Sequence, residues 1–108
     1  MHHGEDAMML VRGELCDRLE ALQATRQRLS ARDFALRVDG MRSLAAAYGL
    51  TPVVRLAEAL ERAVGKSGND LRCCPTALYL TRLRDAIGCE RLDDAASEAL
   101  LASVSVRL

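Results

Sequence analysis

The spacing of apolar residues is the feature that most constrains how this chain can fold. From about residue 8 to residue 29, apolar side chains recur every three or four positions, with Arg, Glu and Gln between them. This period matches the turn of an α-helix, so the apolar side chains share one face. Two later segments repeat it. The predicted inward positions of the three segments are Met8, Val11, Leu15, Leu19, Leu22, Leu29, Val53, Leu56, Ala57, Leu60, Val64, Leu80, Leu83 and Ile87.

Residues that start or stop helices separate these segments. Ser30 can cap a second helix over about residues 31–48 because its hydroxyl can accept a bond from a free backbone amide. Gly49 can end that helix, since glycine readily adopts the left-handed backbone conformation. Thr51 and Pro52 are then expected as the N-cap and the first residue of a third helix.

Two further helices are expected after one longer connection. Residues 66–74 are rich in Ser, Gly, Asn and Asp, which favour turns. Pro75 can open a fourth helix that Gly88 ends, and Asp93 or Asp94 can cap a last one. The other links are short, which favours antiparallel neighbours and an up-and-down bundle.

The composition favours the same fold. A chain of 108 residues buries about 65% of its extended surface on folding, which is enough for one core. Half of the residues are hydrophobic, yet they include only one Phe and two Tyr, so Leu, Ala, Val and Met must fill that core. We therefore expect one all-α domain over residues 1–108, an antiparallel four-helix bundle with about five helices in total and with residues 1–7 disordered.

Charge and hydropathy indicate which partners to expect. Fifteen basic and fifteen acidic residues cancel and are interspersed, so there is no basic patch of the kind that holds nucleic acid or an anionic membrane. The first residues lack a basic segment followed by a long apolar run, and no apolar stretch approaches the roughly 20 residues that span a bilayer. We expect a cytoplasmic protein with neither a nucleic-acid nor a membrane partner.

Sequence motifs for catalysis and metal binding are missing. The P-loop, GxSxG and HExxH patterns do not occur. The two histidines, His2 and His3, sit at the N-terminus. The cysteines lack CxxC spacing and are expected as free thiols at Cys16, Cys73, Cys74 and Cys89. No enzyme activity, cofactor or metal site is expected.

The second predicted helix has one unusual face. Its core stripe is expected to contain Phe34, Val38, Met41, Ala45 and Tyr48. The opposite side carries Arg32, Ala35, Leu36, Asp39, Gly40, Ser43, Ala46 and Ala47. Solvent faces usually carry more Glu, Lys and Gln. This many small residues therefore indicate a surface that is closely approached, either by another helix of the bundle or of a dimer, or by a binding partner. The partner-binding residues we expect are Asp39, Arg42, Ser43, Ala46, Leu36, Gly40 and Ala35.

The segment DGMRSLAAAYGLTPVVRLAEALE, residues 39–61, resembles the helix-turn-helix core of histidine phosphotransfer (HPt) domains in bacterial phosphorelays. That family has His, two residues, Lys, Gly, then small residues and a turn that ends in Gly. Aligned on Gly49, Asp39 stands in place of the phosphoacceptor His, Arg42 in place of the Lys and Ser43 in place of the Gly. The likeness starts at about residue 34 by residue type and covers the rest by helix order.

Another alignment, on Gly40, puts Leu36 at the acceptor position and Asp39 at the Lys position. Neither alignment supplies a histidine. HPt chemistry needs an imidazole nitrogen as nucleophile toward an aspartyl phosphate, so this chain is not expected to relay phosphate in that way. Asp39 is not expected to accept phosphate either, because carboxylate acceptors need a metal and a positioned cation. An exposed Asp39 that pairs with Arg42 or Ser43 is the plainer alternative.

The resemblance implies a bundle of HPt type and a protein of two-component signalling without its own phosphohistidine, a pseudo-phosphotransferase. The partner it implies is the receiver domain of a response regulator or a histidine kinase. The alternative function is a purely structural homodimerisation module that uses the same Gly, Ala and Leu36 face.

Overall fold

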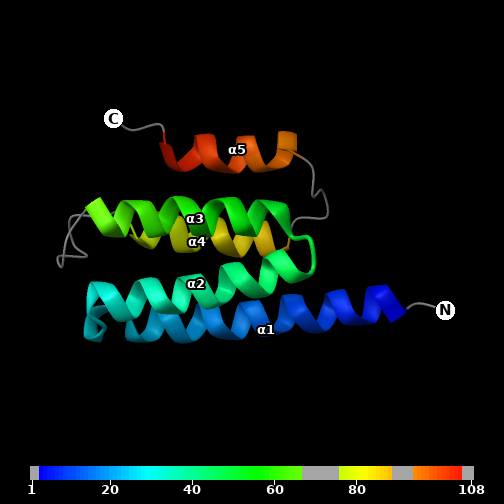
Figure 1. Ribbon diagram of the computed structural model, residues 1–108, viewed down its shortest axis with the longest axis horizontal. Helices are drawn as coiled ribbons and strands as arrows, with labels where there is room; N and C mark the ends of the chain where they lie inside the picture. Colours follow the sequence, from blue (N-terminus) through cyan, green and yellow to red (C-terminus); the bar gives the residue numbers. More distant parts are fainter. Residues whose placement is uncertain (1–2, 67–75, 89–93, 106–108) are drawn as a thin grey trace.

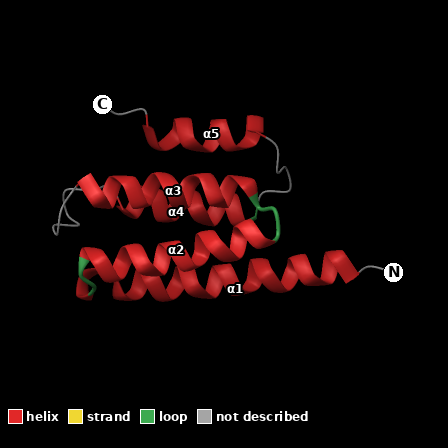
Figure 2. Ribbon diagram, viewed as in Figure 1, coloured by secondary structure: helices red, strands yellow, loops and turns green. Residues whose placement is uncertain are grey.

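The computed structural model describes residues 3–66, 76–88 and 94–105. Its helices are α1 (His3–Thr25), α2 (Ala31–Ala47), α3 (Thr51–Lys66), α4 (Thr76–Ile87) and α5 (Asp94–Ser105), with a 3₁₀ turn, η1, at Arg26–Arg28. The described residues contain no strand (Figure 2). The predicted all-α class is therefore confirmed.

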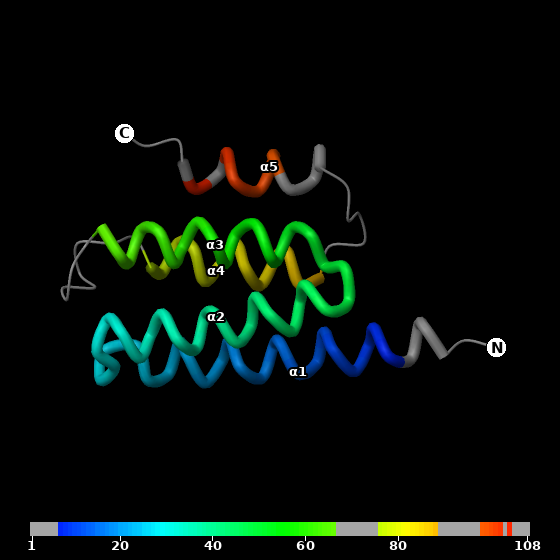
Figure 3. The backbone as a smooth tube through the Cα atoms, in the orientation of Figure 1, coloured from blue at the N-terminus to red at the C-terminus, as the bar shows by residue number. Residues whose placement is uncertain are grey.

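Successive helices run in opposite directions (Figures 1 and 3). Helix α1 packs against α2 and α4, and α3 also packs against α2 and α4, so these four helices close into a bundle. Helix α5 lies outside the bundle, against α3 and α4. The predicted up-and-down four-helix bundle with one additional helix is confirmed.

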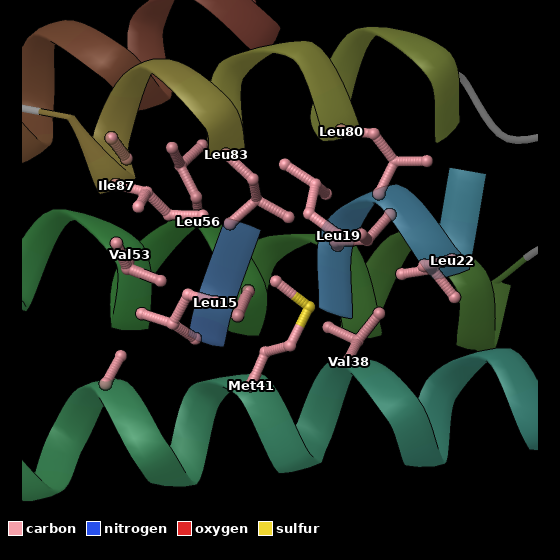
Figure 4. Packing of buried hydrophobic residues seen from close by; sticks show 14 of the residues in the cluster. Leu15, Leu19, Leu22, Val38, Met41, Val53, Leu56, Leu80, Leu83 and Ile87 are labelled. Carbon is pink, nitrogen blue, oxygen red and sulfur yellow. The ribbon is translucent and has the colours of Figure 1, made fainter. Parts of the chain in front are cut away.

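One apolar core runs along the bundle and receives side chains from α1 to α4 (Figure 4). The labelled residues of the core are Leu15, Leu19, Leu22, Val38, Met41, Val53, Leu56, Leu80, Leu83 and Ile87. Burial of each aliphatic side chain of this size stabilises the fold by about 1.5–3 kcal/mol relative to its exposed state. The inward positions predicted for the third and fourth helices are all buried, whereas Met8 and Leu29 are only partly buried.

The N-terminal end of α2 is fixed by a side-chain cap. The hydroxyl of Ser30 accepts a hydrogen bond from the backbone amide of Asp33 at 3.0 Å, and Ser30 itself is extended, with φ −67° and ψ 161°. The carboxylate of Asp33, in the first turn, also suits the positive end of the helix dipole. The predicted cap is confirmed.

The C-terminal end of α2 forms a Schellman motif. Gly49 has φ +74°, and its amide donates to the carbonyl oxygen of Ala46 at 3.3 Å. The amide of Leu50 donates to the carbonyl oxygen of Ala45 at 3.0 Å, and both of these side chains are fully buried. This pattern satisfies carbonyls that the helix end would leave free, and it confirms Gly49 as the helix stop.

Helix α1 both begins and ends earlier than the sequence predicts. The sequence predicts a helix start at about residue 8, whereas α1 starts at His3. Once a helix has nucleated, each added residue gains a backbone hydrogen bond, so the helix can extend beyond the apolar period. At the other end α1 stops at Thr25, and η1 leads to an extended Leu29, with φ −91° and ψ 142°, where the chain reverses.

Two predicted positions at the α2–α3 junction are also wrong. Tyr48 is 45% exposed instead of buried, because α2 ends at this residue and its backbone, with φ −114° and ψ 11°, has left the helix. Helix α3 starts at Thr51 instead of Pro52. The amide of Val54 donates to the carbonyl oxygen of Leu50 at 3.1 Å, which makes Leu50 the N-cap.

Several predictions lie outside the described residues. They concern the connection before α4 and the segment before α5, namely Pro75, Cys73, Cys74, Cys89 and Asp93. Cys16 is described and is a half-buried free thiol in α1. Helix α5 begins at Asp94, one of the two predicted caps.

Candidate interaction surface

The outward side of α2 carries most of the small residues that the sequence singles out. Leu36 is 61% exposed, and Ser43, Ala46 and Ala47 are exposed as well. Helix α2 packs between α1 and α3, so this strip is bordered by a different helix on each side. We call the strip the α2 face, and it consists of Leu36, Asp39, Gly40, Ser43, Ala46 and Ala47.

Ala35 does not belong to the α2 face. It lies seven residues before Arg42, which puts both side chains on the flank of α2 that meets α3. Ala35 is half-buried and packs against the core. Ala35 thus lies at the border between the core and the open side, and its role in binding a partner stays a prediction.

Arg42 links the α2 face to α3. Its Nη2 and Nε atoms donate to Oδ1 of Asp39 at 2.5 and 3.1 Å, and its Nε lies 3.7 Å from Oε1 of Glu61 on α3. The Arg42 side chain is 29% exposed and that of Asp39 is 48% exposed. Ion pairs at such positions contribute only about 0–1 kcal/mol to stability. The main consequence is geometric, since Arg42 holds the Asp39 carboxylate at the edge of the α2 face.

On the flank next to α3, acidic side chains lie near Arg42. Glu61 has a pKa above its usual range, first because of burial and then because of the negative charge of Asp39, while Arg42 opposes the shift. The hydrogen bond and the charge of Asp39 raise the pKa of Arg42, and Glu58 is close enough to interact with both Arg42 and Glu61. Three carboxylates thus surround one guanidinium.

The flank next to α1 is a groove with basic residues. It has a volume of about 300 Å³ and is lined by Arg18, Ala21, Leu36, Arg37, Gly40 and Met41. A Cβ atom at Gly40 would lie 3.4 Å from Nη1 of Arg18, so the glycine lets the arginine approach α2 closely. The Nε atom of Arg18 donates to Oε2 of Glu14 at 2.8 Å. Both charged residues that line the groove are arginines.

Sequence reasoning did not identify the residues that other helices bring to α2. Arg18 comes from α1, and Glu58 and Glu61 come from α3. Glu61 is the last residue of the segment that resembles HPt domains, but its contact with Arg42 depends on how far α3 is rotated and shifted along α2. No local pattern in the sequence specifies that placement.

The arrangement is suited to recognition of a protein surface. It offers one exposed leucine, several side chains too small to keep a partner away, and ion-paired charged side chains on both flanks. Within the described residues, no three His, Cys, Asp or Glu side chains gather so that they could hold a metal ion. In the same part of the chain, no helix combines the length and apolar character that crossing a membrane requires.

No protein-family model matches this chain, and searches of curated proteins and of solved structures find no match either. The resemblance to HPt domains therefore rests on the residue pattern of α2 and α3 and on the helix order. The position aligned with the phosphoacceptor of that family is Asp39 on the α2 face.

Proposed function

We propose that this chain is an HPt-like protein of two-component phosphorelay signalling that binds a receiver domain or a histidine kinase. It does so through the α2 face and carries no phosphate on a histidine. The observation that supports this proposal is the α2 face itself, where small side chains surround a carboxylate that Arg42 orients. The antiparallel bundle agrees with the helix order of the family.

The chemistry of Asp39 fits binding better than phosphotransfer. Its carboxylate already accepts two hydrogen bonds from Arg42, and Glu61 adds negative charge beside it. A single carboxylate carries one negative charge where a phosphoryl group carries nearly two. The protein acts by occupying the docking surface of its partner, and it competes with, scaffolds or sequesters that partner.

Binding can be tested with a substitution at the centre of the face. Receiver domains and histidine kinases of the source organism, phosphorylated and unphosphorylated, are passed over the immobilised wild type and Ser43→Arg. Ala102→Arg is the matched control, because it adds the same charge at an exposed position of α5. We expect one partner to bind the wild type and the control, and Ser43→Arg to lose it. Equal binding by Ser43→Arg refutes the α2 face as the docking site.

Phosphotransfer gives a second test with a gain of activity. Asp39→His puts an imidazole at the aligned acceptor position, where its nitrogen can attack the phosphorus of a receiver's aspartyl phosphate. The phosphorus–oxygen bond to the receiver breaks as the phosphorus–nitrogen bond forms. We expect phosphate on Asp39→His and none on the wild type or on Asp39→His combined with Ser43→Arg. A bound variant that stays unphosphorylated shows that α2 does not present an HPt-type acceptor.

The exposure of Leu36 favours a second candidate function. Leu36 is 61% exposed and lines the groove between α1 and α2, and a purely structural homodimer would bury it without any signalling partner. The binding experiment separates the two functions, because only the first requires a receiver domain or kinase that binds.

A further inference from the structure

Glu61 lies at the seam between α2 and α3 with one oxygen enclosed. Its side chain is 27% exposed, yet its Oε1 atom is buried and accepts no hydrogen bond from the described part of the chain. The Nε atom of Arg42 lies 3.7 Å from this oxygen, which is too far for a hydrogen bond, and donates to Oδ1 of Asp39 at 3.1 Å. A charged oxygen that is buried needs a donor. The geometry therefore suits a neutral, protonated Glu61.

Asp39 is the acceptor for the proton of a neutral Glu61. The two carboxyl groups are close enough to share a hydrogen bond, which requires that one of them carries a proton. Burial raises the pKa of Glu61, and the negative charge of Asp39 raises it further. Asp39 is 48% exposed and accepts two hydrogen bonds from Arg42, so its charged form is well satisfied. The proton of this carboxyl pair therefore belongs on Glu61.

The other charged groups around the carboxyl pair act more weakly than Arg42 or have partners of their own. Glu58, one turn earlier on α3, affects Glu61 less than Arg42 does. On α4, Arg82 pairs with Asp85, and Arg84 bonds to α1. The remaining described charges of α2 are exposed, namely Arg32, Asp33 and Arg37. Those of α3 and α5 are exposed as well, namely Arg55, Arg62, Lys66 and Glu98. Water and salt screen exposed charges, so Arg42 is the cation that responds to the pair.

Loss of the proton changes which carboxylate Arg42 neutralises. An ionised Glu61 with a buried oxygen needs a countercharge, and the Arg42 guanidinium is the cation that lies against it. A side-chain movement that brings Nε of Arg42 onto Oε1 of Glu61 takes it away from Oδ1 of Asp39, where it is bonded now. Asp39 then presents a less neutralised carboxylate to solvent, since its side chain is about half exposed.

We propose that Glu61 and Arg42 form a proton switch that sets the charge of the α2 face. With a proton on Glu61, Arg42 is bonded to Asp39, as in the structure, and neutralises it. When the proton leaves to water, Arg42 turns to Glu61 and the Asp39 carboxylate faces solvent as a free negative charge. The switch operates without a partner. Its effect on docking rests on the proposed function, because a partner that recognises the Asp39 charge then binds more tightly as pH rises.

Carbon-13 NMR of the side-chain carboxyl groups in the full-length chain, from about pH 3 to about pH 8, tests the carboxyl pair. We expect two steps at Asp39, namely its own ionisation and a second step at the pH at which Glu61 ionises. Glu61→Gln should remove the second step. Glu58→Gln is the matched control, because it makes the same change at an exposed residue one turn away, and it should keep the step. A wild type without the second step overturns the proposal, as does a step that persists in Glu61→Gln.

Nitrogen-15 NMR of Arg42 shows whether its guanidinium moves. We expect the Nε–H signal to shift at the pH at which Glu61 ionises and to stay constant over that range in Glu61→Gln. In Arg42→Gln, Glu61 should ionise at a higher pH than in the wild type, because the charge of Arg42 opposes the raised pKa of Glu61. Thermal melts show whether each variant is folded. An Arg42 signal that does not respond to the ionisation of Glu61 refutes the switch.

The switch and the proposed function fail independently. A chain whose Arg42 and Asp39 respond to Glu61, but which binds no receiver domain or kinase, supports the switch and refutes the proposed function. Docking without that response refutes the switch and leaves the proposed function intact. If both hold, the dissociation constant of the docked partner should fall at least about tenfold as pH rises through the ionisation of Glu61. Glu61→Gln should keep the weaker, low-pH affinity throughout.

Discussion

Helices α2 and α3 are antiparallel neighbours of 17 and 16 residues, and their outward sides differ. Helix α3 exposes charged side chains along its length, from Arg55 to Lys66, whereas α2 exposes charged side chains only in its first half and small ones, Ser43, Ala46 and Ala47, in its second half. The inward sides of both helices form a continuous apolar stripe. The comparison teaches that the bundle requires only the stripe, so the core does not specify the small exposed side chains in the second half of α2.

The largest effect should separate the two sides of α2. Phe34 is fully buried, so Phe34→Ala removes a large apolar group, leaves a cavity and should lower the free energy of unfolding by about 3–5 kcal/mol. Leu36→Ala, only two residues away, should change it by less than about 0.5 kcal/mol. Urea denaturation of both variants, at protein concentrations too low for the chain to dimerise, measures the two free energies of unfolding. Similar losses from both would show that the α2 face serves folding.

The glycines at the ends of the two helices should respond in opposite directions. Gly49 has φ +74°, so Gly49→Ala forces a side chain into the left-handed region and should cost about 1–2 kcal/mol. Gly65 lies within α3, and an added Cβ would meet no atom within 4 Å. Gly65→Ala should therefore stabilise the protein, by no more than about 1 kcal/mol. The midpoints of urea unfolding measure the change in stability of each variant. A stabilising Gly49→Ala would contradict the Schellman motif.

Serines at the start and on the face of α2 give a third contrast. Ser30→Ala removes the acceptor that caps the Asp33 amide and should cost about 1 kcal/mol. Ser43→Ala makes the same chemical change at an exposed helical position, where alanine is the better helix former, and should be neutral or slightly stabilising. Chemical denaturation measures both, and equal effects would argue against the cap.

The smallest expected effect is a pH dependence of stability that arises at Glu61, where α3 contacts Arg42 of α2. The pKa of Glu61 is raised in the folded state, so the folded protein binds its proton more tightly than the unfolded chain does. This contribution to stability is fully present below the usual pKa of about 4.5 and is lost as pH rises through the folded-state pKa. Glu61→Gln cannot titrate there.

We therefore expect the stability of the wild type relative to Glu61→Gln to rise as the pH is lowered from neutral toward about 4.5. Urea unfolding of both proteins across this range gives the difference, in which the other titrating groups largely cancel. A difference that falls with decreasing pH would mean that the attraction of Arg42 outweighs burial at Glu61.

Much of the fold could be predicted because helix signals are local. The three-to-four-residue period identified the buried side chains of α3 and α4, and Ser30 and Gly49 identified both ends of α2. The wrong predictions occur where the rest of the chain overrides the local pattern. Tyr48 fits the apolar period but sits on the last turn, and His3 joins α1 although its segment has no apolar period.

The candidate site could be predicted only in part. A helical wheel of α2 places Leu36, Ser43 and Ala46 on the outward side, and all three are exposed in the structure. The helical wheel cannot show that Ala35 is half-buried against the core, because it describes an isolated helix. It also cannot supply the charges that other helices contribute.

The sequence by itself determined the helical class and most of the inward-facing positions, since both depend on spacing along one chain segment. Only the tertiary structure decided that Glu61 meets Arg42 and that Arg18 lies beside Gly40. Such contacts join residues far apart in the chain, and they depend on the rotation and offset at which whole helices pack. For the same reason the cluster in which Arg42 lies beside carboxylates of α2 and α3 exists only in the assembled bundle.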